Sequence, residues 1–183
     1  MFDIIIPTLL FLIPICYIKF VNKKSLIEAL KELIPKSQGW KKETTGAIAL
    51  FGALFLGFLI LTMGISFFEM GTGIVINDLD KVGNVIGNEL AFDAVGFILL
   101  MIVLVFLEEF FFRSFLVPRI GMVISTIFFM IVHYGYNSIS ELIGAFFLGL
   151  ILAYWFKKKG SLIQNYFGHL FYNILAILFY ILL

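Results

Sequence analysis

Long apolar stretches separated by short polar connections dominate the pattern of this chain. About 20 apolar helical residues suffice to cross a bilayer, and six stretches approach or exceed this length. They lie at about residues 4–21, 45–68, 90–118, 122–140, 141–156 and 161–183. The pattern therefore predicts an all-α fold, a polytopic integral membrane bundle of about six transmembrane helices. We expect residues 1–183 to form a single transmembrane domain.

Two polar connections have a pattern of their own. Ser25 and Glu28 stand in capping-box spacing ahead of a stretch that stops at Pro35, which predicts a short helix. This helix either lies on the membrane surface or is a plain connector. Residues 70–90 are rich in Gly, Asn and Asp, and they are predicted to form a loop with turns.

The composition agrees with a membrane protein and narrows its partners. Hydrophobic residues make up 62% of the chain and charged residues only 14%, whereas a soluble domain carries about a quarter charged residues. The lipid bilayer is therefore an expected partner. A net charge of +1 argues against nucleic acid, which calls for a basic surface.

The positive charges predict how the chain lies in the membrane. Of the 13 Lys and Arg residues, all but Lys81 fall in or beside the odd-numbered connections between spans. The positive-inside rule makes that side cytoplasmic, so both termini are predicted outside. We expect a prokaryotic plasma membrane as the location.

Three spans carry ionisable residues at a similar depth. A charge at the bilayer centre costs roughly 2.5–3.5 kcal/mol, so such residues need a reason. Counted at 1.5 Å per helical residue, Glu108 lies about 15 Å, His133 about 16 Å and His169 about 12 Å from the cytoplasmic side. The three helices are therefore predicted to bring a carboxylate and two imidazoles into one layer.

Helical spacing separates the roles of the neighbouring residues. Glu109 and Arg113 are four residues apart, which predicts an ion pair on one face. His169 and Asn173 have the same spacing and share a face. Phe129 stands one turn before His133 and is expected to wall the same cavity.

These residue types fit amide hydrolysis. A carboxylate at an apolar site is a suitable general base, so Glu108 is expected to take a proton from water that His133 helps to hold. His169 and Asn173 are expected to donate hydrogen bonds to the oxyanion of the tetrahedral intermediate.

A metal site is the first alternative. Glu108, His133 and His169 form a His2Glu set that suits catalytic zinc, although no HExxH pair is present. We favour a site without a metal or other cofactor and keep zinc as the alternative. A small transporter with a polar relay, and a non-enzymatic scaffold or immunity protein, are alternatives from other classes.

Three motifs in order resemble a known family. EEFFFR at 108–113 fits EExxxR, FMIVH at 129–133 fits FxxxH, and HLFYN at 169–173 fits HxxxN. Together they resemble the CAAX protease and bacteriocin-processing family, also called the abortive-infection family. Its best-known members are the Ras-converting CAAX prenyl endopeptidases. The resemblance covers the motif-bearing half of the chain, about residues 90–183.

The resemblance implies intramembrane proteolysis in a cavity that opens to the cytoplasm. By motif position, Glu108 is the implied catalytic glutamate, and Glu109 and Arg113 support it. The site is completed by residues of the second and third motifs, which are His133, His169 and Asn173. The implied substrate is a membrane-associated peptide or a lipidated protein such as a prenylated CAAX protein. Members of the family are often labelled metalloproteases, so a zinc-dependent mechanism remains an alternative.

Overall fold

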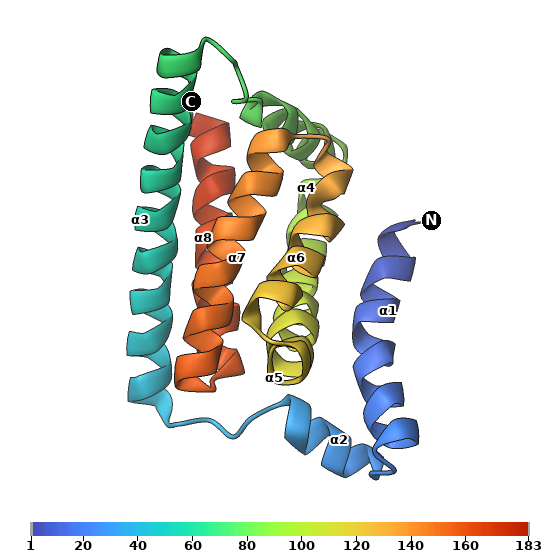
Figure 1. Ribbon diagram of the computed structural model, residues 1–183. Coiled ribbons are helices and arrows are strands. Elements are labelled where there is room, and N and C mark those ends of the chain that lie inside the picture. Colours follow the sequence, from blue (N-terminus) through green and yellow to red (C-terminus); the bar gives the residue numbers. More distant parts are fainter. Residues whose placement is uncertain (1, 183) are drawn as a thin grey trace.

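A computed structural model describes residues 2–182 of the chain and the side chains of residues 5–179. This part of the chain is helical and contains no strand, which confirms the expected all-α fold. The segments are α1 (Phe2–Cys16), η1 (Tyr17–Val21), α2 (Leu26–Leu33), α3 (Trp40–Thr72), α4 (Leu79–Glu108), η2 (Glu109–Leu116), α5 (Val117–Ile120), α6 (Met122–Val132), η3 (His133–Tyr136), α7 (Ile139–Lys159) and α8 (Leu162–Leu182). Figure 1 shows α3, α7 and α8 side by side, with α1 at the opposite edge of the bundle.

Four stretches of the described chain are long and apolar enough to cross a membrane. They are Trp40–Thr72, Leu79–Ile120, Ile139–Lys159 and Leu162–Phe179, and they correspond to the second, third, fifth and sixth predicted spans. The first and fourth predicted spans form shorter apolar helices, Ile5–Val21 and Met122–Tyr136. Four of the six predicted segments are therefore candidate membrane-spanning helices by length and composition.

The third predicted span changes its winding at the EExxxR motif. α4 ends at Glu108, and the next eight residues, Glu109–Leu116, form a π-helix. Ser125 of α6 donates a hydrogen bond of 2.5 Å to the carbonyl of Phe112 inside this π-helical segment. A π-helical turn within an α-helical span is rare and is often found at functional sites.

The predicted loop at residues 70–90 is mostly helical. α3 continues to Thr72 and α4 begins at Leu79, because Leu79, Val82 and Ile86 recur on one helical face and bury it against the bundle. α4 bends at Asp93, whose φ and ψ are −154° and 85°. Residues 79–92, termed the roof segment here, cross one end of the bundle near the top of Figure 1.

The short helix predicted after the first span is confirmed as α2. Its capping box is complete, because Glu28 N–H donates to Ser25 Oγ at 3.3 Å and Ser25 N–H donates to Glu28 Oε2 at 2.8 Å. Ala29 and Leu33 are fully buried against η1 and η2. α2 therefore packs beneath the π-helix that carries the motif, at the bottom of Figure 1.

Asp78 fastens the α3–α4 connection to the start of α7. Its Oδ1 accepts hydrogen bonds from Ser138 Oγ at 2.7 Å and Ser140 N at 3.1 Å, and its Oδ2 accepts one from Ile139 N at 3.1 Å. Partial burial disfavours the charged carboxylate. The hydrogen bonds from Ser138, Ser140 and Ile139 outweigh this effect and hold the pKa of Asp78 well below its ordinary value of 3.8.

We expect Asp78→Asn to lower the free energy of unfolding by about 1–2 kcal/mol, because an amide nitrogen then faces backbone N–H donors at the start of α7. The carboxylate stabilises the fold fully above its unfolded pKa and less as the pH falls through its lowered folded pKa. The difference between the two proteins should therefore shrink in acid. Thermal unfolding in detergent measures both effects.

Asp80→Asn is the matched control, since Asp80 is exposed two residues further along the same helix. Equal unfolding temperatures for the Asp78 and Asp80 variants at neutral pH would contradict the role assigned to Asp78.

Candidate functional site

Glu109 is fully buried, and both of its carboxylate oxygens have partners. His169 Nδ1 lies 2.9 Å from Oε1. Asn165 Nδ2 donates to Oε2 at 3.1 Å, and Arg113 Nε lies 3.5 Å from the same oxygen. The Glu109–Arg113 ion pair predicted from spacing is thus confirmed. Both oxygens of Glu109 are therefore occupied by side chains of η2 and α8.

The Arg113 guanidinium, at the end of the EExxxR motif, is buried inside the bundle. Its side chain is fully buried, and its Cζ lies 4.1 Å from the centroid of the Phe129 ring, within cation–π range. Its charge balances that of Glu109. The pair therefore adds little net charge to the cavity described below.

The two histidines are held by their Nδ1 atoms. His133 Nδ1 lies 2.8 Å from the carbonyl oxygen of Phe129. A carbonyl oxygen only accepts, so Nδ1 of His133 carries a proton. The same reasoning puts a proton on Nδ1 of His169, which faces the Glu109 carboxylate. In both rings, Nε2 remains for water or substrate.

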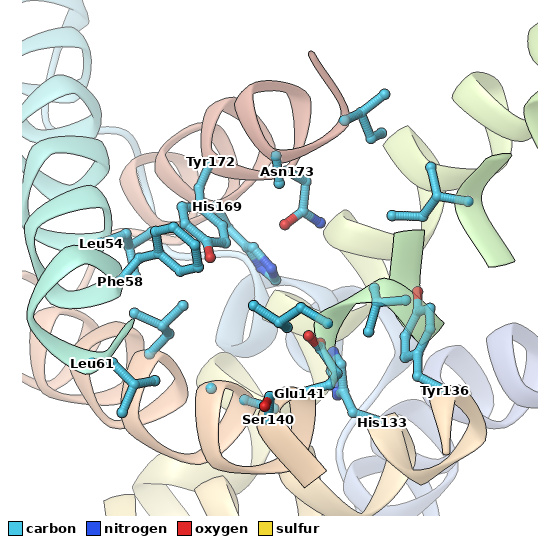
Figure 2. Close-up of a pocket in the computed structure, with 18 of the residues that line it drawn as sticks. Leu54, Phe58, Leu61, His133, Tyr136, Ser140, Glu141, His169, Tyr172 and Asn173 are labelled. Atoms are coloured by element: carbon cyan, nitrogen blue, oxygen red, sulfur yellow. The ribbon is translucent and has the colours of Figure 1, made fainter. Parts of the chain in front are cut away.

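Both imidazoles line one cavity of about 170 Å³, together with Asn173. Figure 2 shows His169 and Asn173 reaching into it from α8, while His133 approaches from the other side. Phe129 forms part of the wall, with its ring centroid 4.4 Å from that of His133 and 6.0 Å from that of His169. The structure therefore brings four of the predicted site residues together.

Glu108 lies beside this cavity. It is half-buried at the end of α4 and is not among the described residues that form the cavity wall. Glu108 nevertheless interacts electrostatically with Tyr136, Glu141 and Arg113. Tyr136 and Glu141 both line the cavity. In contrast to Glu109, the Glu108 carboxylate accepts no hydrogen bond from the described side chains.

Glu141 is a cavity residue that the sequence analysis did not identify. It occupies the first turn of α7, where Ser138 and Glu141 repeat the Ser-x-x-Glu spacing of Ser25 and Glu28. In α2 the glutamate bonds back to the capping serine, whereas in α7 the hydroxyl of Ser138 donates to Asp78 instead. The Glu141 carboxylate turns into the cavity beside His133 (Figure 2).

Asn165 is a second residue that was missed. It is fully buried and bridges the carbonyl oxygen of Leu152, at 2.9 Å, and Glu109 Oε2. The available signal was its spacing, because Asn165, His169 and Asn173 follow one another every four residues on one face of α8.

The residues named for the zinc alternative are not gathered as a ligand cluster in this arrangement. Within the described chain, no three His, Cys, Asp or Glu side chains gather closely enough to hold a metal ion. Nδ1 of His169 faces Glu109 and Nδ1 of His133 faces a backbone carbonyl, which leaves Nε2 of each ring without such a contact. The set of Glu108, His133 and His169 therefore does not form a coordination site in this geometry.

The cavity extends away from the lysine-rich end of the bundle. Its wall follows α3 from Leu54 to Ile65 and reaches Leu79 at the start of α4 and Ser140 at the start of α7. These positions lie toward the connections that the charge pattern predicts to be outside. The expected cytoplasmic opening finds no support in this lining.

Comparison with known proteins identifies the motif-bearing half. Residues 90–175 match the family described as type II CAAX prenyl endopeptidase Rce1-like, a family of proteases. Neither the curated proteins nor the solved structures contain a match to the chain. Together with the four apolar helices, this match indicates an integral membrane protein. The segment 90–175, which contains all three motifs, is a member of the type II CAAX prenyl endopeptidase Rce1-like family.

Proposed function

We propose that this protein is an intramembrane endopeptidase that hydrolyses a peptide bond with water activated by Glu108. The substrate is a membrane-associated peptide or a prenylated CAAX-type protein. One observation carries the proposal: two imidazoles and an amide line one cavity, while Glu109 is sealed in an ion pair and leaves Glu108 as the free carboxylate of the motif.

The chemistry begins with a water molecule between Glu108 and His133. Glu108 takes a proton from this water, and Nε2 of neutral His133 accepts a hydrogen bond that orients it. The resulting hydroxide attacks the carbonyl carbon of the substrate. When the carbon–nitrogen bond of the tetrahedral intermediate breaks, Glu108 returns the proton to the leaving amine.

His169 and Asn173 stabilise the oxyanion of that intermediate. Asn173 donates from its amide nitrogen. His169 donates from Nε2 only as an imidazolium, because its Nδ1–H already faces Glu109. The Glu109 carboxylate accepts the hydrogen bond from Nδ1 and so positions the His169 ring.

In the membrane we propose six spanning segments, with the shorter helices Ile5–Val21 and Met122–Tyr136 completing the four long ones. Both termini then lie outside, and residues 1–183 act as one transmembrane domain. This arrangement places the Lys residues beside α2 and at the end of α7 in the cytoplasm.

We expect Glu108→Gln to lower turnover by about 10²–10⁴-fold, because the amide cannot accept the proton of water. Binding of the uncleaved peptide should persist. Purified protein is assayed in detergent with a panel of fluorogenic apolar peptides and a farnesylated CAAX peptide. Glu89→Gln, at an exposed position of the roof segment, is the control. Unchanged cleavage by the Glu108 variant would remove the proposed mechanism.

We expect Glu109→Gln to differ from Glu108→Gln by also destabilising the fold, by about 3–5 kcal/mol, because it leaves the Arg113 charge buried and unpaired. The double variant Glu109→Gln/Arg113→Met should regain part of this stability but not the turnover. Thermal unfolding and peptide cleavage are measured on the same samples. A Glu109 variant as stable as wild type would argue against the ion pair.

We expect chelators to leave peptide cleavage unchanged, since the described ligand-type side chains do not gather as a metal site. Cleavage is measured after dialysis against a chelator and again after addition of zinc, with the metal content determined in parallel. Activity that is lost on chelation and restored only by zinc would reinstate the metalloprotease alternative.

A further inference from the structure

Glu141 is the one carboxylate among the described residues that line the cavity. It is half-buried in the first turn of α7. Its backbone N–H donates to Ser138 Oγ, but the proton of that hydroxyl goes to Asp78, so the Glu141 carboxylate accepts no hydrogen bond from a described side chain. An unpartnered carboxylate in largely apolar surroundings is costly, and an ionisable group inside a membrane span usually serves a function.

The helix face that carries Glu141 leaves room beside the carboxylate. Four residues of this face line the cavity, namely Glu141, Gly144, Ala145 and Leu148. The two residues one turn after Glu141 are therefore small. A Cβ atom added to Gly144 would come no closer than 4.0 Å to another helix, at Cδ2 of Leu61. A side chain of a bound substrate can lie along this face next to Glu141.

Glu141 also lies close to the groups that are proposed to react. Its carboxylate interacts electrostatically with His133, His169 and Glu108, and Figure 2 shows it beside His133. A substrate group that binds to Glu141 is therefore near the peptide bond that the site would hydrolyse.

The charges around the cavity favour a positive ligand. None of the described lining residues is a lysine or an arginine. Of the three carboxylates at or beside the cavity, that of Glu109 is balanced by Arg113, whereas those of Glu108 and Glu141 are not. The net charge therefore stays negative even when His169 is an imidazolium. An anionic group is repelled here, and a cation supplies the partner that Glu141 lacks.

A basic side chain suits both parts of this environment. Lysine and arginine pack their alkyl stems against apolar surfaces while the charged end reaches a polar group. Much of the cavity wall is apolar and includes Leu54, Phe58 and Leu61. Glu141 lies where this apolar wall meets polar residues, since Tyr136 and Ser140 also line the cavity.

From these features we infer that Glu141 determines specificity by binding a lysine or arginine side chain of the substrate near the cleaved bond. This inference rests on the proposed protease function and narrows its substrate class. The favoured substrate is an apolar segment that carries one basic residue close to the bond that is hydrolysed.

Peptides that differ in a single side chain test the inference. The starting peptide is the apolar peptide that is cleaved fastest, or that binds most tightly if none is cleaved. It is acetylated at its N-terminus and made with lysine, norleucine or glutamate at successive positions. Norleucine has the alkyl chain of lysine without the charge. The kcat/KM of each peptide is measured with wild type, with Glu141→Gln and Glu141→Lys, and with the control Glu89→Gln.

We expect wild type to cleave one lysine peptide about 10–100-fold more efficiently than its norleucine counterpart, because the ammonium group pairs with Glu141 at a partly dehydrated site. In Glu141→Gln this ratio should fall to about one, and Glu141→Lys should prefer the glutamate peptide. Glu89→Gln should keep the wild-type ratio, since Glu89 is exposed and is not part of the cavity wall. Equal ratios in wild type and Glu141→Gln would overturn the inference.

The glutamine variant keeps this test decisive. It nearly matches the shape of glutamate and removes no described side-chain hydrogen bond. It therefore tests the charge of Glu141 even where Glu141→Lys fails to fold, and thermal unfolding of each variant shows which of them are folded.

Binding measurements separate this inference from the proposed function. Fluorescence anisotropy compares the lysine and norleucine peptides in Glu108→Gln and in Glu108→Gln/Glu141→Gln. If wild type cleaves no peptide but lysine strengthens binding only in the variant that retains Glu141, the cation site is kept and the protease proposal fails. Cleavage by wild type without a preference for lysine has the opposite meaning. An absence of both cleavage and preference removes both proposals.

Discussion

The buried carboxylate of Glu109 joins the elements that form the candidate site. It binds His169 and Asn165 of α8 and pairs with Arg113 of η2, whose guanidinium packs on Phe129 of α6. An isolated charge inside a low-dielectric bundle costs several kcal/mol, so these partners depend on one another. One charge therefore sets the relative position of three helical segments and the orientation of one imidazole.

One half of the bundle is closely packed and the other contains the cavity, which both imidazoles line. On one side, the buried Asn165 Nδ2 and the side chain of Gln164 form hydrogen bonds to neighbouring helices. On the other side, Glu141 and His133 face a cavity. A reaction that needs water and excludes bulk solvent benefits from such a boundary, because hydrogen bonds and charges are stronger at a partly dehydrated site.

Local spacing predicted some contacts of the site and not others. The four-residue separation of Glu109 and Arg113 was enough to predict their ion pair, because both lie on one helical segment. The contact of Glu109 with His169 joins residues 60 positions apart, and no local pattern contains it. Glu141 was missed for a related reason, because its spacing predicts a capping bond to Ser138. In the fold Ser138 Oγ donates to Asp78 instead, and the Glu141 side chain lines the cavity.

The sequence by itself determined the helical membrane architecture and the identity of the motif residues, since hydropathy and helical periodicity are local properties of the chain. Tertiary structure alone decided that Glu109 also binds His169 and Asn165 of α8. It also decided that residues 79–92 are helical and that the cavity extends away from the lysine clusters. The physical reason is that burial and pairing depend on neighbours brought together by packing, which a linear pattern does not record.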